Sequence, residues 1–191
     1  MLADGMFVQP IHGKGVRVIW LKGETDMLGA LEEVESFGEF AKRNNAVAST
    51  DVKSFEHLIC TEQLSRRLGF KVGEELIRVV RVRSLNGNAR QVDHGYFLAS
   101  IAKGLTPEIA AESIYDYLEH KRGIKVMASR RTVSVELAND EDCSYLDLGK
   151  YNCVAVMESQ SYTSDGILFE VTHARTHPCL LYTSPSPRDR G

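Results

Sequence analysis

Residues 75–98 constrain the fold of this chain more than any other segment, because they predict two β-strands joined by a tight turn. The run Glu75–Ser84 is rich in β-branched residues, which favour strands. Asn86-Gly87 follows it, and this dipeptide tolerates the positive φ angles of a two-residue hairpin turn. Arg90–Leu98 is therefore expected to return antiparallel to Glu75–Ser84.

Three further segments are expected to extend this antiparallel pairing. Lys125–Leu137 alternates between polar and apolar residues in its second half, as a half-buried strand does. Tyr151–Thr163 and Ile167–Thr176 flank the turn-forming residues 164–166, Ser-Asp-Gly, and predict a second hairpin. Together with the first hairpin, these segments predict an antiparallel sheet.

Short helices are expected between the strands, each beginning at a residue that caps a helix N-terminus well. The segment 36–39, Ser-Phe-Gly-Glu, matches a capping box and predicts a helix that continues to Lys42. Other helices are predicted at Thr61–Leu68, from Thr106 to Gly123, and at Asn139–Leu146. Long strands paired through tight turns and separated by short helices predict an α+β domain, an antiparallel sheet with short helices on one side.

The two ends of the chain differ from this central part. Met6–Ile11 and Val16–Trp20 surround a glycine-containing turn, so residues 1–20 predict a separate β-hairpin. Residues 21–34 include a polar, glycine-punctuated stretch, which suits a linker. Residues 179–191 are rich in Ser, Pro and Arg and look like translated sequencing-adaptor sequence, so a disordered tail is expected there.

Composition restricts the class of protein. The 191 residues are 43% hydrophobic and 26% charged, as in soluble globular domains, and no apolar run approaches the ~20 residues of a transmembrane helix. The N-terminus lacks the pattern of a signal peptide, so a cytoplasmic location without a membrane partner is expected. Four cysteines without a CxxC pair predict neither a zinc site nor a disulfide framework. The net charge of −3 argues against a surface that binds nucleic acid as a whole, although the first 22 residues are basic.

Two arginines are the clearest candidates for a binding site. Arg81 and Arg83 are two residues apart in a strand, so both side chains lie on one face and could clamp a phosphate or carboxylate. The same spacing also suits two solvated strand arginines. No phosphate-binding glycine loop or nucleophile motif occurs, and His173 and His177 have the wrong spacing for zinc in a strand, so no enzyme activity, metal or cofactor is expected.

The order of these segments resembles the HutC branch of the GntR family of transcription regulators. Residues 2–18, LADGMFVQPIHGKGVRV, resemble the end of a winged helix-turn-helix domain whose wing carries a Gly-Lys-Gly turn. Residues 35–178 resemble the UTRA-type effector domain of that family, which has the chorismate-lyase fold. The resemblance rests on RVVRVRSLNGNARQVDHGYF, ESIYDYLEHKRGIKV, ANDEDCSYLDL and FEVTHARTHP. It implies truncation at both ends, before Met1, where the DNA-reading helices belong, and after about Pro178.

The resemblance also implies partners. In the family the wing lies against operator DNA, which assigns Gly13, Lys14, Gly15 and Arg17 to DNA binding in the intact protein only. A homodimer is implied as well, because a winged helix dimer reads two half-sites at a fixed spacing.

The family positions imply an effector site of two arginines, two serines and two carboxylates: Arg81, Arg83, Ser36, Ser113, Asp93 and Glu170. The arginines and serines would hold an anion, and the carboxylates would accept hydrogen bonds from hydroxyl groups, a combination typical of a phosphorylated sugar site. Ser36 keeps its second interpretation as a helix cap. Arg175 is a further candidate, whereas Tyr115 is expected in the core.

Within the family, residues 104–123 and 145–162 most resemble the repressors of trehalose operons. This likeness implies trehalose 6-phosphate as an effector that releases the intact repressor from operator DNA. Two alternatives stay open. One is a chorismate-lyase-like enzyme, and the other is a regulator of the same family that senses a non-sugar ligand such as urocanate, because fold does not fix ligand.

Overall fold

A computed structural model describes residues 8–11, 15–18, 37–43, 45–178 and 180. Four predictions concern residues that are wholly or mostly outside these ranges. They are the linker at 21–34, the role of Ser36, the contacts of Gly13 and Lys14, and the tail from residue 179 onward.

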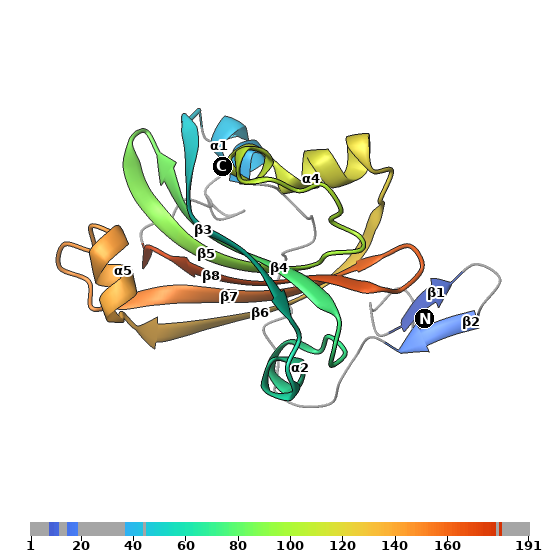
Figure 1. The fold of residues 1–191 in the computed structure, drawn as a ribbon. Helices are drawn as coiled ribbons and strands as arrows, with labels where there is room; N and C mark the ends of the chain where they lie inside the picture. The colour runs from blue at the N-terminus through green and yellow to red at the C-terminus, as the bar shows by residue number, and fades with distance from the viewer. Residues whose placement is uncertain (1–7, 12–14, 19–36, 44, 179, 181–191) are drawn as a thin grey trace, which may run out of the picture.

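A single six-stranded antiparallel sheet forms the body of the domain (Figure 1). Its strand order is β3-β4-β5-β8-β7-β6, so β8, the last strand among the described residues, lies in the interior of the sheet. The strands are β3 (Ala48–Ile59), β4 (Glu75–Leu85), β5 (Asn88–Leu98), β6 (Val126–Leu137), β7 (Cys153–Thr163) and β8 (Leu168–Thr176). The predicted α+β class is confirmed.

Both predicted hairpins of the sheet are present. Asn86 and Gly87 have φ angles of 50° and 78° and form the turn between β4 and β5. Leu85 lies opposite Asn88, directly across that turn. The hairpin predicted near the N-terminus is also present, since β1 (Val8–Ile11) pairs antiparallel with β2 (Gly15–Val18).

Strand β3 was not predicted by the sequence analysis. It contains Asp51, Lys53 and Glu56, and seven of its 12 positions are exposed, so its apolar residues do not alternate regularly. It pairs with β4 alone and forms one edge of the sheet. A bulge between Val52 and Ser54 breaks the alternation further. Charged side chains and bulges are typical of edge strands, where they discourage pairing with other molecules.

The predicted short helices are largely confirmed. They are α1 (Phe37–Arg43), α2 (Glu62–Leu68), α3 (Pro107–Ala111), α4 (Ile114–Asp116), the π-helix η1 (Tyr117–Lys121) and α5 (Asp140–Tyr145). Thr61 caps α2 and Asn139 caps α5, as expected. The helical region from Thr106 is split at Glu112, whose ψ of −106° ends α3.

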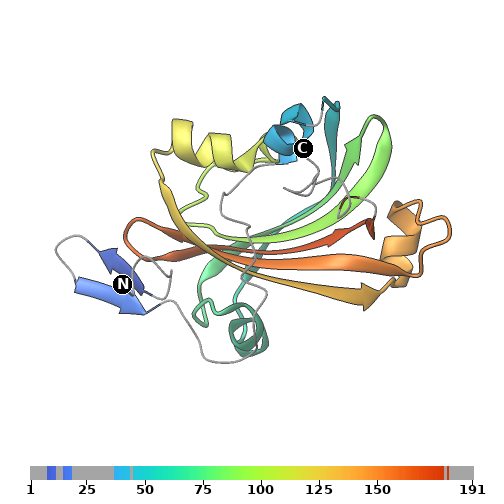
Figure 2. The same ribbon diagram turned by 180° about the vertical axis from the view of Figure 1, so that it is seen from behind.

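The helices cover both faces of the sheet rather than one face, which corrects one detail of the expected architecture (Figures 1 and 2). Helices α1, α3 and α4 lie over the face that carries Arg81. On the opposite face, α5 is tied to β5 by an ion pair between Glu141 and His94. Helix α2 is tied to the same strand by a 2.8 Å hydrogen bond from Arg67 to the Tyr96 hydroxyl.

Gly95 in β5 makes room for the buried ring of Phe97. A Cβ atom at position 95 would lie 2.6 Å from a ring carbon of Phe97, which is fully buried. Phe97 packs in the core cluster with Val79 and Ile114. The absence of a side chain at position 95 therefore sets how the sheet packs beneath α4.

Gly95→Ala is expected to destabilise the chain by about 1–3 kcal/mol, because a displaced core ring is strained. Urea unfolding followed by circular dichroism measures the change. Gly38→Ala is the matched control, since a Cβ at Gly38 in α1 has no atom within 4 Å and alanine favours a helix. Equal stability of the two variants would contradict this account of Gly95.

Candidate functional site

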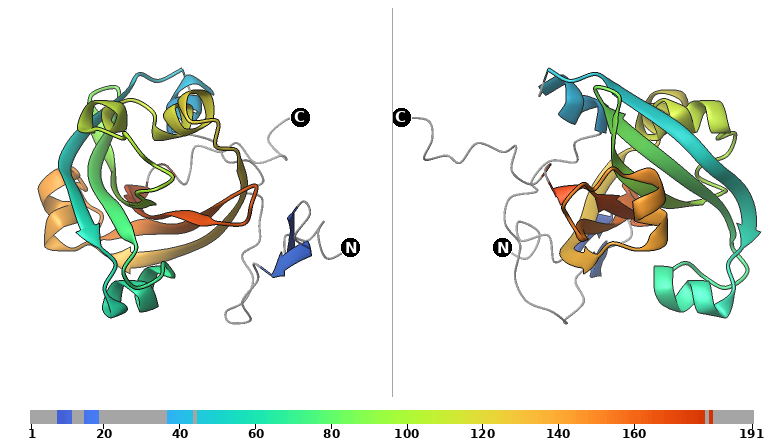
Figure 3. Two further views of the ribbon diagram at one scale, coloured as in Figure 1. Left: turned by 45° about the vertical axis from the view of Figure 1, so that its right-hand side comes forward. Right: turned by 90° about the vertical axis from the view of Figure 1, so that its left-hand side faces the viewer.

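A cavity of about 510 Å³ lies between the sheet and helices α1, α3 and α4. Figure 3 shows the sheet curving around the region that these helices close. Five predicted effector-binding residues line this one cavity: Arg81, Arg83, Asp93, Ser113 and Glu170. They come from four elements that are far apart in sequence, so only the folded chain brings them together.

Strand alternation and register explain how the charged residues meet. Arg81 and Arg83 alternate in β4 and therefore share the face of the sheet that borders the cavity. Arg81 lies directly opposite Asp93 of β5. We call this sheet surface the cavity face.

Asp93 holds both arginines at once. Its Oδ2 atom accepts hydrogen bonds from Nε of Arg81 at 3.1 Å and from Nη2 of Arg83 at 3.0 Å, and a further one from Nη2 of Arg81. The third donor group of Arg81, Nη1, donates to the Ala110 carbonyl at 3.4 Å. Arg81 and Asp93 are 4% and 3% exposed, so this ion pair is shielded from water. All three nitrogens of Arg81 thus have acceptors within the protein.

Arg83 is less completely satisfied than Arg81. Its Nε atom is buried and has no hydrogen-bond partner among the described residues. Its guanidinium lies 5.3 Å from the ring centroid of Phe37, at the side of the cavity formed by α1. Burial, with the neighbouring Arg81 charge, lowers the pKa of Arg83 to about 10. Two positive charges share the one carboxylate of Asp93, and an added anion would relieve this imbalance.

A second polar cluster forms around Glu170 of β8. The Tyr115 hydroxyl donates a hydrogen bond to Glu170 and lies 3.1 Å from Oγ of Ser161. Glu170 is 2% exposed, and this burial raises its pKa despite the hydrogen bonds it accepts. A carboxyl held in this way can exchange hydrogen bonds with hydroxyl groups of a ligand.

Ser113 lines the cavity and also caps α4, because its Oγ accepts a hydrogen bond from the Asp116 N–H at 3.2 Å. Ser36 itself lies outside the described residues, but its neighbours Phe37 and Gly38 border the same cavity. Ser113 therefore combines a capping role with a place at the cavity.

Several residues of the cavity could not be identified from the sequence alone. Tyr115 was expected in the core, but its hydroxyl belongs to the Glu170 cluster. Arg131 of β6 and Ser159 of β7 line the cavity and were not considered. Alternation along β6 and β7 could have placed Arg131 and Ser159 on a common face, but choosing that face requires the sheet order.

Arg175 does not belong to the cavity, which corrects its candidacy. Its guanidinium lies on the opposite face of the sheet, where Nε and Nη2 donate to the Asp142 carboxylate at 2.9–3.0 Å. Asp142 belongs to α5, so Arg175 joins this helix to β8.

Three further predictions concern the N-terminal hairpin, metal binding and membrane-spanning helices. Gly15 and Arg17 lie in β2, for which only the backbone is described. Within the described ranges, no group of three or more His, Cys, Asp or Glu side chains could hold a metal ion. No helix in that part of the chain is long and apolar enough to cross a membrane.

Comparison with known sequences gives consistent matches. The family model described as UTRA domain matches residues 43–178. The HTH-type transcriptional regulator TreR of Bacillus subtilis (strain 168) is 29% identical over 175 residues, which cover 92% of this chain and 72% of TreR. The HTH-type transcriptional repressor NagR of the same organism is 23% identical over 166 residues, which cover 87% of this chain and 66% of NagR.

Solved structures agree with these matches. The effector binding domain of the B. subtilis trehalose repressor (TreR) superposes with a TM-score of 0.63 at 27% identity and covers 72% of this chain and 94% of that domain. PhnF from Mycobacterium smegmatis gives a TM-score of 0.68 over 93% of this chain and 76% of PhnF. The identity to PhnF is 20%, so this second likeness concerns the fold alone.

Proposed function

Since this chain belongs to the UTRA-domain family and is related to the effector-binding domain of the transcriptional regulator TreR, we propose that its cavity binds a phosphorylated sugar as a regulatory effector. In this proposal Arg83 binds the phosphate, Arg81 and Asp93 position Arg83, and the Glu170 cluster binds sugar hydroxyls. The cavity of about 510 Å³ is within the range of roughly 300–1,000 Å³ typical of small-molecule sites.

The shared carboxylate of Asp93 is the observation that carries the proposal. A lone buried arginine paired with an aspartate would be electrically balanced, but here two guanidinium groups share one carboxylate. The excess positive charge is on Arg83, whose Nε has no partner among the described residues. Guanidinium groups bind phosphate through pairs of parallel hydrogen bonds, so a phosphate oxygen is a fitting partner for this group.

Trehalose 6-phosphate is the effector we propose first, because the related structure is that of a trehalose repressor. The curated relatives reported above are transcriptional regulators, which supports a sensing role rather than an enzymatic one. Pyruvate release from chorismate would instead support the chorismate-lyase alternative. Binding of urocanate without any sugar phosphate would support a different ligand class within the same family.

We further propose that the β1–β2 hairpin acts as the wing of a DNA-binding domain in the intact protein. Gly13, Lys14, Gly15 and Arg17 would then lie near the DNA backbone of an operator. Effector binding to a homodimer would weaken operator binding only as much as operator DNA weakens effector binding, because such coupling is reciprocal. The chain spans 72% of TreR, so this part of the proposal concerns a longer protein.

Arg83→Met is expected to weaken binding of trehalose 6-phosphate about 10- to 100-fold, as expected for the loss of a hydrogen bond to a charged group. Isothermal titration calorimetry with the full chain measures the dissociation constant. Arg78→Met is the matched control, because Arg78 lies in the same strand on the opposite face and contacts Glu56 at 3.3 Å. If Arg83→Met binds the ligand as tightly as the unchanged chain, the phosphate is held elsewhere.

A further inference from the structure

Arg131 of β6 lines the cavity but takes no part in the proposed binding of phosphate at Arg83. It lies on the edge strand opposite Ser159 of β7. Three strands separate β6 from β4, where Arg83 lies. Four steps between neighbouring strands span about 19 Å of sheet, although the curvature of the sheet shortens the path across the cavity. The cavity therefore has one arginine group at each end.

The floor between these two ends is built from small residues. Arg131 faces Ser159, Ser159 faces Thr172 of β8, and Ala174, two residues further along β8, faces Asp93 of β5. Ser159, Thr172 and Ala174 all line the cavity. These small side chains leave space above the sheet, and the two hydroxyl groups among them offer hydrogen bonds to a ligand. An elongated ligand fits such a floor better than a compact one.

The surroundings of Arg131 are rich in hydroxyl groups. Burial raises the pKa of the Tyr115 phenol well above its usual value, and the nearby Arg131 charge acts against this rise. The Glu170 carboxyl and the Ser161 hydroxyl are hydrogen-bonding neighbours of that phenol. The Glu170 and Tyr115 groups also act on the charge of Arg83, and β8 lies between β4 and β6, so this hydroxyl-binding cluster lies between the two arginine ends.

We propose that Arg131 is a specificity-determining residue that binds the second, uncharged unit of a two-unit sugar phosphate whose phosphate lies at Arg83. This inference rests on the proposed function and adds that the site prefers a two-unit sugar phosphate to a one-unit sugar phosphate. A monosaccharide phosphate would occupy the Arg83 end alone and gain nothing from Arg131. A disaccharide phosphate would extend along the row of small residues and reach it.

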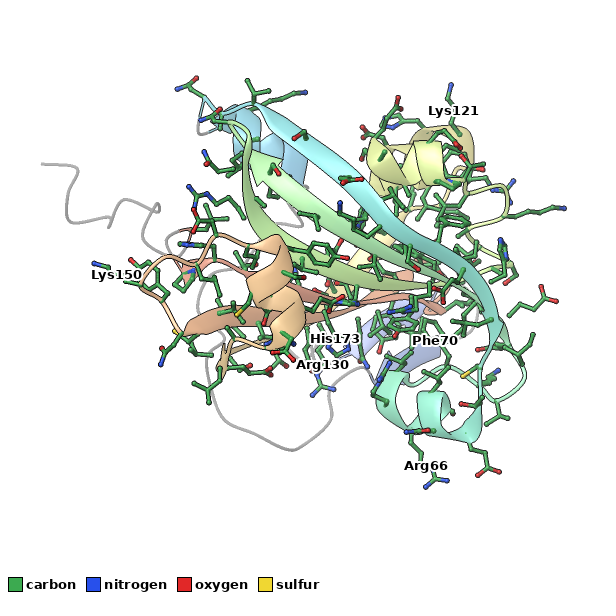
Figure 4. The ribbon with its side chains drawn as sticks, turned by 60° about the vertical axis from the view of Figure 1, so that its left-hand side comes forward. Arg66, Phe70, Lys121, Arg130, Lys150 and His173 are labelled. Carbon is green, nitrogen blue, oxygen red and sulfur yellow. The ribbon has the colours of Figure 1, made fainter. Side chains whose placement is uncertain are left out.

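The neighbouring Arg130 provides a matched control. Consecutive strand residues point to opposite faces, so Arg130 lies on the face away from the cavity. There it borders a small groove with His173, and Figure 4 places the two side chains together. Arg130→Met removes the same charge from the same strand without touching the cavity.

The test compares Arg131→Met, Arg130→Met and Arg83→Met as full chains by isothermal titration calorimetry. The probes are trehalose 6-phosphate, glucose 6-phosphate and inorganic phosphate. Arg131→Met is expected to weaken trehalose 6-phosphate binding about tenfold while changing glucose 6-phosphate binding less than twofold. Arg83→Met is expected to weaken both, and Arg130→Met neither. Arg131→Gln serves as a second variant if the methionine variant unfolds.

The outcomes separate this inference from the proposed function. If trehalose 6-phosphate binds through Arg83 but neither Arg131 variant changes its affinity, the role of Arg131 is wrong and the proposed function stands. If both Arg131 variants weaken the two sugar phosphates equally, Arg131 does not distinguish a second unit. If the unchanged chain binds no sugar phosphate, the proposed function fails and the inference fails with it.

Discussion

Asp93→Ala is expected to lower the free energy of unfolding by about 3–5 kcal/mol, because it leaves two guanidinium groups beside each other without their carboxylate. Arg81 is 4% exposed and cannot turn to water without moving the strand. Its Nε and Nη2 atoms both lose their acceptor, and Arg83 loses its hydrogen bond of 3.0 Å. Chemical unfolding in urea, followed by circular dichroism, measures the loss.

Two further variants separate charge from packing. Asp93→Asn keeps the shape of the side chain and removes its charge, so most of the destabilisation should remain. Adding Arg81→Met to Asp93→Ala removes one of the two buried charges and is expected to recover part of the lost stability. A loss below about 1 kcal/mol for Asp93→Ala would contradict a buried ion pair at this position.

The same ion pair predicts how stability depends on pH. Burial alone would raise the pKa of Asp93, but the charges of Arg81 and Arg83 outweigh it and hold the pKa below its ordinary value. A folded-state pKa below the unfolded value of about 3.9 gives stability that is complete above that pH. The contribution is lost as the pH falls through the folded-state pKa. The stability difference between the unchanged chain and Asp93→Asn should therefore shrink below about pH 4.

Local patterns explain why much of the sheet could be predicted from sequence. The β4–β5 hairpin was predictable because Asn86-Gly87 determines its turn within a few residues. The capping box at Asn139 determines the start of α5 in the same way. Strand β3 lacks such a signal, since its identity depends on pairing with β4 at the edge of the sheet. Tertiary pairing, rather than intrinsic preference, makes this segment a strand.

The candidate site was only partly predictable for a related reason. Strand spacing placed Arg81 and Arg83 on one face, and family resemblance suggested Ser113 and Glu170. The position of Asp93 between the two arginines depends on the register of β4 and β5, which a spacing argument does not supply. Its carboxylate was expected to meet sugar hydroxyls, but in the structure it accepts hydrogen bonds from the arginines. That contact makes Asp93 a positioning residue in the proposed site.

Arg175→Met is expected to destabilise the chain by a similar amount, about 3–5 kcal/mol, although Arg175 lies outside the cavity. The Asp142 carboxylate is fully buried and accepts three hydrogen bonds from Arg175 at 2.9–3.0 Å. After the substitution, its remaining partner among the described residues is the Asn139 N–H at 2.9 Å. Arg175 also donates hydrogen bonds to Glu136 and to the Leu137 carbonyl of β6. The substitution therefore removes the side chain that joins β8 to both α5 and β6.

The comparison of Arg175 with Asp93 separates structural charge pairs from the proposed site. At a temperature where both variants remain folded, Arg175→Met should bind trehalose 6-phosphate as the unchanged chain does, because its contacts lie on the opposite face of the sheet. Asp93→Ala should lose affinity together with stability, because Arg83 loses the group that positions it. Arg66→Met is the surface control, since the Arg66–Glu62 pair is 80% and 77% exposed and exposed pairs stabilise little. If Arg175→Met weakened ligand binding as strongly as Asp93→Ala, the two faces of the sheet would not be independent. The proposal that Arg83 binds the phosphate would then lose its structural basis.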